Sequence, residues 1–228
     1  MEKGHKNKFM NQAEIFFKKE ADSWFTRNEG RLAAKKVEED WTMRFIKKYK
    51  LRPKRVLEIG SSNGWRLNFI NKIYGAKCTA VEPSAKAIKQ GRKLYPKIDF
   101  RRGMAEKLPI KENEKFDMVV INYVFHWVDR NNIFKAFAEA DRVLKNGGYL
   151  LFTDFYPDRP MRVPYHHLRG KNVFTYKMDY TSVFTLTGFY KLLKQVFYHH
   201  SYTLAKMKIK PEDRGVTSLL KKDINFLK

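Results

Sequence analysis

Apolar and polar positions change their rhythm along this chain of 228 residues. Over residues 8–28 and 30–49, aromatic and aliphatic side chains recur at helical spacing among charges, which predicts two helices. From residue 55 to 154, short apolar runs alternate with helical patterns. This alternation predicts an α/β chain with a parallel sheet that helices cover on both faces.

The apolar runs of this middle region predict five buried strands, at residues 56–59, 77–81, 98–101, 116–121 and 149–154. The patterns between them predict helices at residues 65–74, 84–94 and 133–144. Asn146-Gly147-Gly148 is expected to cap the last helix, because glycine and asparagine accept the left-handed conformation at helix ends.

The rhythm is lost after residue 154. Residues 155–181 are rich in Pro, Tyr, His and Arg without a clear period, and we interpret them as an insertion or lid. A helix is expected at 186–197, and two strands at 198–206 and 215–222, joined by the turn residues 211–215.

The expected fold class is therefore a doubly wound, mostly parallel seven-stranded sheet of Rossmann-like type, with a final antiparallel strand. We expect one domain over residues 1–228. Its parts would be N-terminal helices or a lid (1–50), a cofactor-binding core (51–155), a substrate insertion (155–181), and a C-terminal helix with a strand pair (182–228).

Composition narrows the class of protein. No apolar stretch is long enough to span a membrane, and the basic start of the chain is not followed by the apolar stretch of a secretory signal. The single Cys78 excludes an intrachain disulfide and a multi-cysteine zinc site. We expect a cytoplasmic protein with no membrane partner and no metal, and its oligomeric state stays open.

The formal net charge of +23 makes this a strongly basic protein. It indicates either an anionic partner, such as a nucleic acid or a phosphorylated small molecule, or a solvated surface rich in lysine. Lysines outnumber arginines 32 to 15 and are scattered along the chain, which favours the second interpretation.

Residues 55–64 carry the clearest chemistry. A short apolar run ends in Gly60 and Gly64, and a helical pattern follows, which is the layout of a nucleotide-cofactor loop. Glu58 is unusual there, because a carboxylate would repel a pyrophosphate but would suit a cationic ligand or one with amine or hydroxyl groups. Glu82 lies 22 residues past Gly60 at the next strand end, where it can accept hydrogen bonds from two ribose hydroxyls or remain a surface residue.

Four ordered motifs resemble the class I S-adenosylmethionine-dependent methyltransferases, most closely their small-molecule branch, over about residues 50–155. They are the loop from Glu58 to Gly64, the acid Glu82, Gly103-Met104-Ala105-Glu106 with Leu108-Pro109, and the segment from Phe116 to the His126-Trp127 pair. The resemblance implies S-adenosyl-L-methionine as cofactor. The cofactor-binding residues that it implies are Glu58, Gly60, Ser61, Ser62, Asn63, Gly64, Glu82, Pro83, Met104, Ala105 and Asn122. Ser62 departs from the family's pattern, because it occupies the place of the middle glycine of the loop.

Methyl transfer from a sulfonium needs mainly alignment of the two reactants, and a base only where the acceptor must lose a proton. We expect a small, anionic acceptor methylated on oxygen or nitrogen, with a nucleotide-linked sugar as one candidate. The alternatives are an RNA methyltransferase and a non-catalytic partner subunit with the cofactor fold.

Candidate residues on the acceptor side come from three segments. His126 can act as a base or pack structurally beside Trp127, and the pair His166-His167 can act in the pocket or lie on the surface. The candidate catalytic residues are His126, Tyr165, His166 and His167. The candidate substrate or lid residues are Trp24, Arg27, Arg159, Arg162, Tyr176 and Lys177, although the aromatic helix that carries Trp24 can also simply pack on the sheet.

Overall fold

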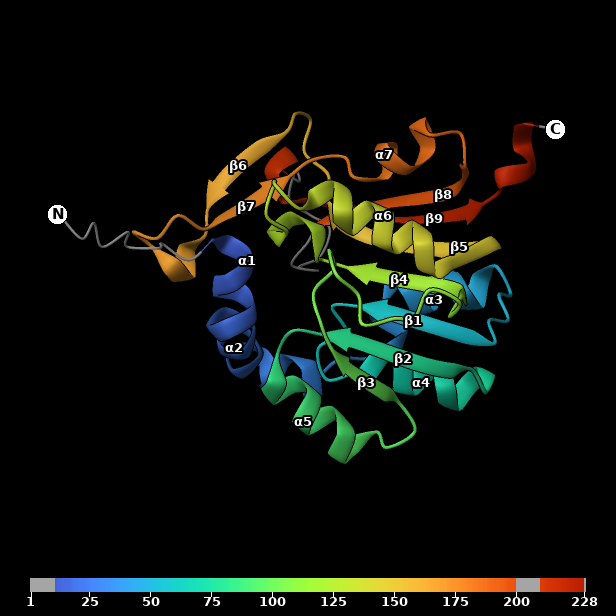
Figure 1. Ribbon diagram of the computed structural model, residues 1–228, viewed down its shortest axis with the longest axis horizontal. Helices are drawn as coiled ribbons and strands as arrows, with labels where there is room; N and C mark the ends of the chain where they lie inside the picture. The colour runs from blue at the N-terminus through green and yellow to red at the C-terminus, as the bar shows by residue number, and fades with distance from the viewer. Residues whose placement is uncertain (1–10, 200–209, 228) are drawn as a thin grey trace, which may run out of the picture.

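A seven-stranded sheet forms the centre of the protein in the computed structural model, which describes residues 11–199 and 210–227 (Figure 1). The order across the sheet is β3-β2-β1-β4-β5-β9-β8, and β9 runs in the direction opposite to the other six strands. The strands are β1 (Arg55–Ile59), β2 (Lys77–Glu82), β3 (Asp99–Arg102), β4 (Phe116–Asn122), β5 (Leu144–Phe155), β8 (Tyr190–His199) and β9 (Arg214–Lys222). The predicted fold class is confirmed.

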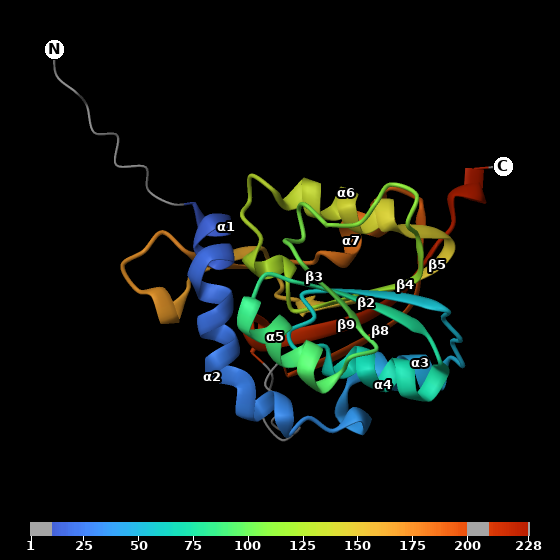
Figure 2. The same cartoon turned by 60° about the horizontal axis from the view of Figure 1, so that its bottom comes forward.

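Helices cover both faces of this sheet (Figure 2). On one face lie α3 (Trp41–Lys48), α4 (Trp65–Tyr74) and α5 (Ala85–Leu94), and on the other α6 (Ile133–Val143) and α7 (Thr181–Leu186). Each face has its own buried apolar cluster, one containing Ile46 and Leu67, the other Phe152 and Phe184. The near-continuous apolar runs of the central strands follow from this double covering.

The first four strands and the helices between them agree with the expected ranges to within one residue. The junction after α6 differs, because the chain passes from Val143 directly into β5. Asn146-Gly147-Gly148 therefore does not cap the helix but lies inside β5, at an irregularity opposite β4. The left-handed Gly147, with φ 76°, serves this irregularity.

The N-terminal helices differ from the expected ones at their boundary. One helical segment runs from residue 12 to 33 as α1 (Gln12–Ile15), a π-helical turn η1 (Phe16–Glu20) and α2 (Ala21–Ala33). After the 3-10 turn η2 (Val37–Glu39), the side chain of Asp40 accepts a hydrogen bond from Met43 N and begins α3. The expected break near residue 29 is thus wrong, and residues 8–10 lie outside the described part.

The expected helix at 186–197 is wrong, because residues 190–199 form β8. A β-bulge shifts the register between Leu192 and Lys194, so the apolar positions 189, 192, 193, 196 and 197 imitate helical spacing. Of the strand expected at 198–206, residues 198 and 199 end β8 and the others lie outside the described residues. The strand expected at 215–222 is β9, preceded by the 3-10 turn η5 (Pro211–Asp213) and followed by η6 (Ile224–Leu227).

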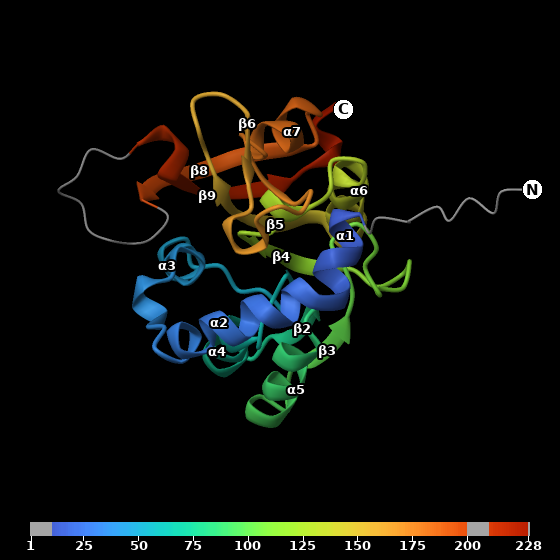
Figure 3. The same ribbon diagram turned by 90° about the vertical axis from the view of Figure 1, so that its left-hand side faces the viewer.

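Residues 155–181 contain a small antiparallel hairpin of β6 (Met161–Pro164) and β7 (Phe174–Lys177), with the 3-10 turn η4 (His166–Leu168) between them. This hairpin lies beside helix 12–33 (Figures 1 and 3). Gln12 joins the two, because its side chain donates to Phe174 O at 3.0 Å and accepts from Phe174 N at 2.8 Å. Among the described helices, none combines the length and the apolar character needed to cross a bilayer.

Candidate functional site

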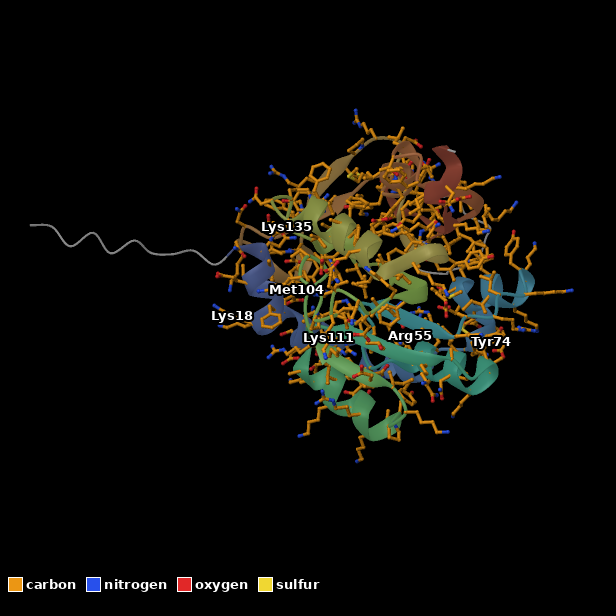
Figure 4. All side chains as sticks on the ribbon, turned by 45° about the vertical axis from the view of Figure 1, so that its right-hand side comes forward. Lys18, Arg55, Tyr74, Met104, Lys111 and Lys135 are labelled. Atoms are coloured by element: carbon orange, nitrogen blue, oxygen red, sulfur yellow. The ribbon has the colours of Figure 1, made fainter. Side chains whose placement is uncertain are left out.

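A cavity of about 350 Å³ opens at the carboxyl ends of β1, β2 and β4, where the strand order reverses. Helix 12–33 covers it from the other side, with Phe16 and Trp24 among the lining residues. Met104, labelled in Figure 4, packs partly buried against the cluster of Ile15 and Phe16 on this helix. The cofactor-binding candidates that line the cavity are Gly60, Ser61, Ser62, Glu82, Pro83, Met104, Ala105 and Asn122.

The glycine loop between β1 and α4 owes its shape to left-handed backbone. Gly60 and Gly64 have φ of 73° and 75°, and a Cβ on Gly60 would come within 2.4 Å of a methyl group of Val124. Ser62 also has a positive φ, 51°, although it carries a side chain. The position therefore suits glycine, and serine occupies it under strain.

Glu82 ties the loop to the second strand. Its two carboxylate oxygens accept hydrogen bonds from Ser62 N at 2.8 Å and from Ser84 N at 2.9 Å. The group is buried and lines the cavity, and this burial raises the pKa of Glu82 to about 7. Each oxygen retains a lone pair with which it can accept a further hydrogen bond from a ligand hydroxyl.

Glu58 does not line the cavity. It is fully buried and forms an ion pair with Arg66, which also binds Asp40, with Arg66 Nη2 2.9 Å from Asp40 Oδ2. Burial raises the pKa of Glu58 to about 7, against the opposing effect of Arg66. Two carboxylates thus share one guanidinium. Of these three residues, only Arg66 lines the cavity.

Two more cations, Arg31 and Lys35, line the same part of the cavity as Arg66. Burial lowers the pKa of Lys35, and the positive charge of Arg66 lowers it further. Because Asp40 and Glu58 already pair with Arg66, Arg31 and Lys35 are the cations whose charge a ligand carboxylate would neutralise. The sequence interpretation missed these residues, although Arg66 stands in the first turn of the helix that follows Gly64.

A buried histidine–aspartate pair lies on the other side of the cavity. His126 Nδ1 lies 2.8 Å from Asp154 Oδ1, and both side chains are almost fully buried. The Asp154 carboxylate also accepts from the backbone N–H groups of His126 at 3.2 Å and of Phe155 at 2.8 Å. His126 lines the cavity, and the rings of Trp127 and Phe155 lie 4.4 and 5.0 Å from its own.

Asp154 was not among the expected site residues. The sequence did contain a sign of its role, because Asp154 is a polar residue near the carboxyl end of β5. Asn122 has the same kind of position at the end of β4. Asp154 follows His126 by 28 positions in the sequence, and nothing in the sequence indicated that the two side chains would meet.

Two candidates from the N-terminal helix have different places. Trp24 lines the cavity and packs edge-on against Trp127, with ring centroids 6.0 Å apart. Arg27 does not line it, and instead pairs with Glu20 and donates to the Tyr165 hydroxyl at 3.1 Å. Tyr165 is buried and donates to Glu20 at 2.8 Å, so it joins the insertion to helix 12–33 rather than lining the cavity.

The other candidates of the insertion also lie away from the cavity wall. His166 and His167 are exposed, with ring centroids 3.9 Å apart, and Arg159 is exposed. Arg162 lies over Phe174, Tyr176 lies under Arg130, and Lys177 donates to Glu212 O at 2.6 Å. Lys177 comes nearest, because its ammonium lies 4.2 Å from the ring centre of Phe155, a lining residue.

Two residues of the glycine loop also stand behind the cavity wall. Asn63 donates to Gln90 at 2.7 Å and so connects the loop to α5, while Gly64 is the N-cap of α4.

Comparison with known proteins gives matches over the same core. Residues 57–152 match the family model described as "Methyltransferase domain". A phthiotriol/phenolphthiotriol dimycocerosates methyltransferase 1 of Mycobacterium ulcerans is 38% identical over 107 residues, which are 46% of this chain and 38% of that protein. A demethylmenaquinone methyltransferase of Chlorobaculum parvum is 28% identical, over 54% of this chain and 50% of that protein. The chain thus matches half or less of the length of these relatives.

Among solved structures, the Burkholderia thailandensis 1,6-didemethyltoxoflavin-N1-methyltransferase superposes with a TM-score of 0.64 at 13% identity. The match covers 89% of this chain and 87% of that one. The likeness extends to the helices and strands outside residues 57–152, and at this identity it concerns the fold.

Proposed function

Because the chain belongs to the class I S-adenosylmethionine-dependent methyltransferases, we propose that it transfers a methyl group from that cofactor to a hydroxyl group of a small, largely apolar acceptor. The observation that carries the proposal is the buried His126–Asp154 pair at the wall of the cofactor cavity. It supplies a base beside a site whose wall includes the rings of Phe16, Trp24, Trp65, Tyr123, Trp127 and Phe155.

The cavity residues fit the cofactor of the family. Arg31, Lys35 and Arg66 can hold the carboxylate of its amino-acid end, and Glu82 can accept from the ribose hydroxyls. The buried Ser62 Oγ and Glu106 Oε2, which line the same cavity, have no hydrogen-bond partner among the described residues. They are available for the cofactor's polar groups. When bound, the cofactor supplies an activated methyl on a positively charged sulfur.

The protein's own contribution to the reaction is alignment and removal of one proton. Since the Asp154 carboxylate can only accept, the His126 Nδ1 hydrogen points to it, and Nε2 is the nitrogen that takes the proton. With the cofactor and an acceptor bound, Nε2 would take the proton of the acceptor hydroxyl as the C–O bond forms and the methyl–sulfur bond breaks, and Asp154 would stabilise the imidazolium that results. A positioned base of this kind contributes about 10²–10⁴ in rate.

The walls around His126 support an apolar acceptor. Tyr123, Trp127 and Phe155 present rings to the same cavity, whereas Arg159 and Arg162, on which the expectation of an anionic acceptor or a nucleotide-linked sugar rested, do not line it. Two of the relatives are named for a phthiotriol derivative and a demethylmenaquinone, which agrees with an acceptor of this class.

The test is methyl transfer from labelled S-adenosylmethionine to a panel of phenols, hydroquinones, amines and nucleotide-linked sugars, together with calorimetric titration of the cofactor. We expect cofactor binding and methylation of hydroxyl-bearing aromatic acceptors. His126→Ala should lower kcat by about 10²–10⁴ with the cofactor Kd unchanged. His166→Ala, at an exposed histidine outside the cavity, is the control.

Each outcome has its own meaning. No heat with the cofactor would overturn the methyltransferase itself. Cofactor binding with transfer only to nucleotide-linked sugars would overturn the apolar acceptor, and an unchanged kcat in His126→Ala would remove the base.

A further inference from the structure

The cavity does not account for the positive charge of the chain, and several of the cations lie at one edge of the sheet. β8 is the last strand of the sheet order, so one of its sides has no neighbouring strand among the described residues. α7 lies next to it at this edge, while β3 and α5 lie at the opposite edge (Figure 1).

Large apolar side chains gather at the β8 edge. Nine such side chains are exposed in the described residues, and six of them belong to α7, β8 and the residues around them. They are Leu186, Phe189, Leu192, Leu193, Phe197 and Ile224. Leu186 is 85% exposed, and Asp223 N donates to Phe189 O at 2.8 Å, which brings the start of η6 beside the start of β8. A cluster of this kind on a basic protein marks an interaction surface.

Cations alternate with these apolar residues. Lys191 and Lys194 are exposed on β8 and flank Leu192 and Leu193. Lys194 also lines a groove between β8 and α3, of about 390 Å³, together with Arg44, Lys47 and Lys48. None of the eight residues that line this groove is acidic. α3 and α7 cover opposite faces of the sheet, so the groove and the apolar cluster meet at the exposed strand β8, and we call the two together the β8-edge surface.

We propose that the β8-edge surface binds the surface of an anionic phospholipid membrane. The leucines and Phe189 would enter the boundary between headgroups and acyl chains, and the lysines and Arg44 would bind the lipid phosphates. We expected no membrane partner because the sequence contains no apolar stretch long enough to span a membrane. Binding at the membrane surface does not require such a stretch, so the two observations are compatible. It also gives a function to five of the cations of this basic protein, which are Arg44, Lys47, Lys48, Lys191 and Lys194.

Two other occupants fit the surface less well. A second copy paired edge to edge would have to bring Lys191 and Lys194 of both copies together, and lysines on an edge strand oppose this pairing. A nucleic acid would leave the apolar cluster unused. The indole of Trp41 in the groove also lacks an open face for a base, because Arg44 lies 4.6 Å from its centre and Tyr198 stacks on it at 5.6 Å.

The test is flotation of the full chain with vesicles of phosphatidylcholine alone or with about 30% phosphatidylglycerol. We expect binding only to the anionic vesicles, weakened between about 0.05 and 0.5 M salt. Lys191→Glu/Lys194→Glu should weaken binding about tenfold or more. Leu186→Ser/Leu193→Ser, which keeps the charge, should also weaken it.

The matched control is Lys89→Glu/Lys93→Glu on α5, which changes the net charge equally at the opposite edge and should bind as the unchanged protein does. Circular dichroism and cofactor titration verify that each variant is folded. Absence of flotation, equal losses in both charge variants, or no loss in the leucine variant would overturn the proposal. So would single-stranded RNA that binds in a Lys191- and Lys194-dependent way while the vesicles do not.

Discussion

The backbone N–H of Ser62 donates a hydrogen bond to Glu82 Oε2 at 2.8 Å, and so joins the glycine loop after β1 to the end of β2. The left-handed conformation of Ser62 turns this N–H toward the carboxylate. This arrangement costs free energy, because the backbone of Ser62 is strained and its hydroxyl is buried without a hydrogen-bond partner in the described residues.

Ser62→Gly should therefore stabilise the protein. Removing the left-handed strain should stabilise the folded state by about 1 kcal/mol. The larger backbone entropy of glycine in the unfolded chain offsets part of this stabilisation. We expect a net gain of about 0.5 kcal/mol in the free energy of unfolding, measured with urea. Ser61→Gly, at a residue without a positive φ, should instead destabilise. If both variants lowered the free energy of unfolding equally, the conclusion that Ser62 is strained would be contradicted.

Glu82 should make stability depend on pH. Its pKa is about 7 in the folded protein and 4.5 as an ordinary carboxyl, so the folded state binds more protons between these values. Stability from this group is present below pH 4.5 and is lost as the pH rises through 7. The loss is at most about 3 kcal/mol.

Glu82→Gln removes this titration, although it also breaks one hydrogen bond at every pH. The difference in unfolding free energy between the variant and the unchanged protein should therefore move in the variant's favour from pH 5 to pH 8. A difference that stays constant over this range would contradict the raised pKa. Glu114→Gln is the control: the guanidinium of Arg101 lowers the pKa of Glu114, so the contribution of this residue changes only at acid pH and the difference should stay constant from pH 5 to pH 8.

Arg66→Leu should destabilise strongly. It leaves Glu58 and Asp40 buried without their common cation, and breaking a buried ion pair in this way costs about 3–5 kcal/mol. Adding Glu58→Gln should recover part of the loss, because one buried charge then disappears. If the double variant is as unstable as the sum of the two single ones, the coupling between Arg66 and Glu58 is absent.

Gln12→Ala should loosen the cover of the cavity. The side-chain amide donates to Trp127 O at 2.7 Å and bonds both backbone groups of Phe174, so its loss releases helix 12–33 from the hairpin. We expect faster amide exchange over residues 12–24 and a cofactor Kd raised about fivefold, equivalent to about 1 kcal/mol. Glu14→Ala on the same helix should change neither, and an unchanged exchange rate in Gln12→Ala would exclude the anchoring role.

The middle of the chain was predictable because its signals are local. In residues 55–74 a strand, a glycine turn and a helix follow one another, and each is decided by neighbours within a few positions. Because the strands are parallel, the carboxyl ends of β1, β2 and β4 lie side by side at the same end of the sheet. The places of Gly60, Glu82 and Asn122 at the cavity follow from this.

The ends of the chain were less predictable. A single bulge between Leu192 and Lys194 gave β8 the apolar spacing of a helix, and only pairing with β9 makes it a strand. The Asn146-Gly147-Gly148 segment carries the residue types of a helix cap, yet it lies inside β5, in the irregularity between the pairs Phe116–Leu144 and Met118–Tyr149.

By itself, the sequence determined the fold class, the cofactor loop and the family resemblance, because these depend on periodicity and on residues close together in the chain. The tertiary structure alone decided which charged groups meet: Arg66 with Glu58 and Asp40, and His126 with Asp154. It also turned the arginines of the insertion away from the cavity wall and set aromatic rings around His126. These contacts join residues from different elements, and their distances exist only once the sheet and its covering helices are packed together.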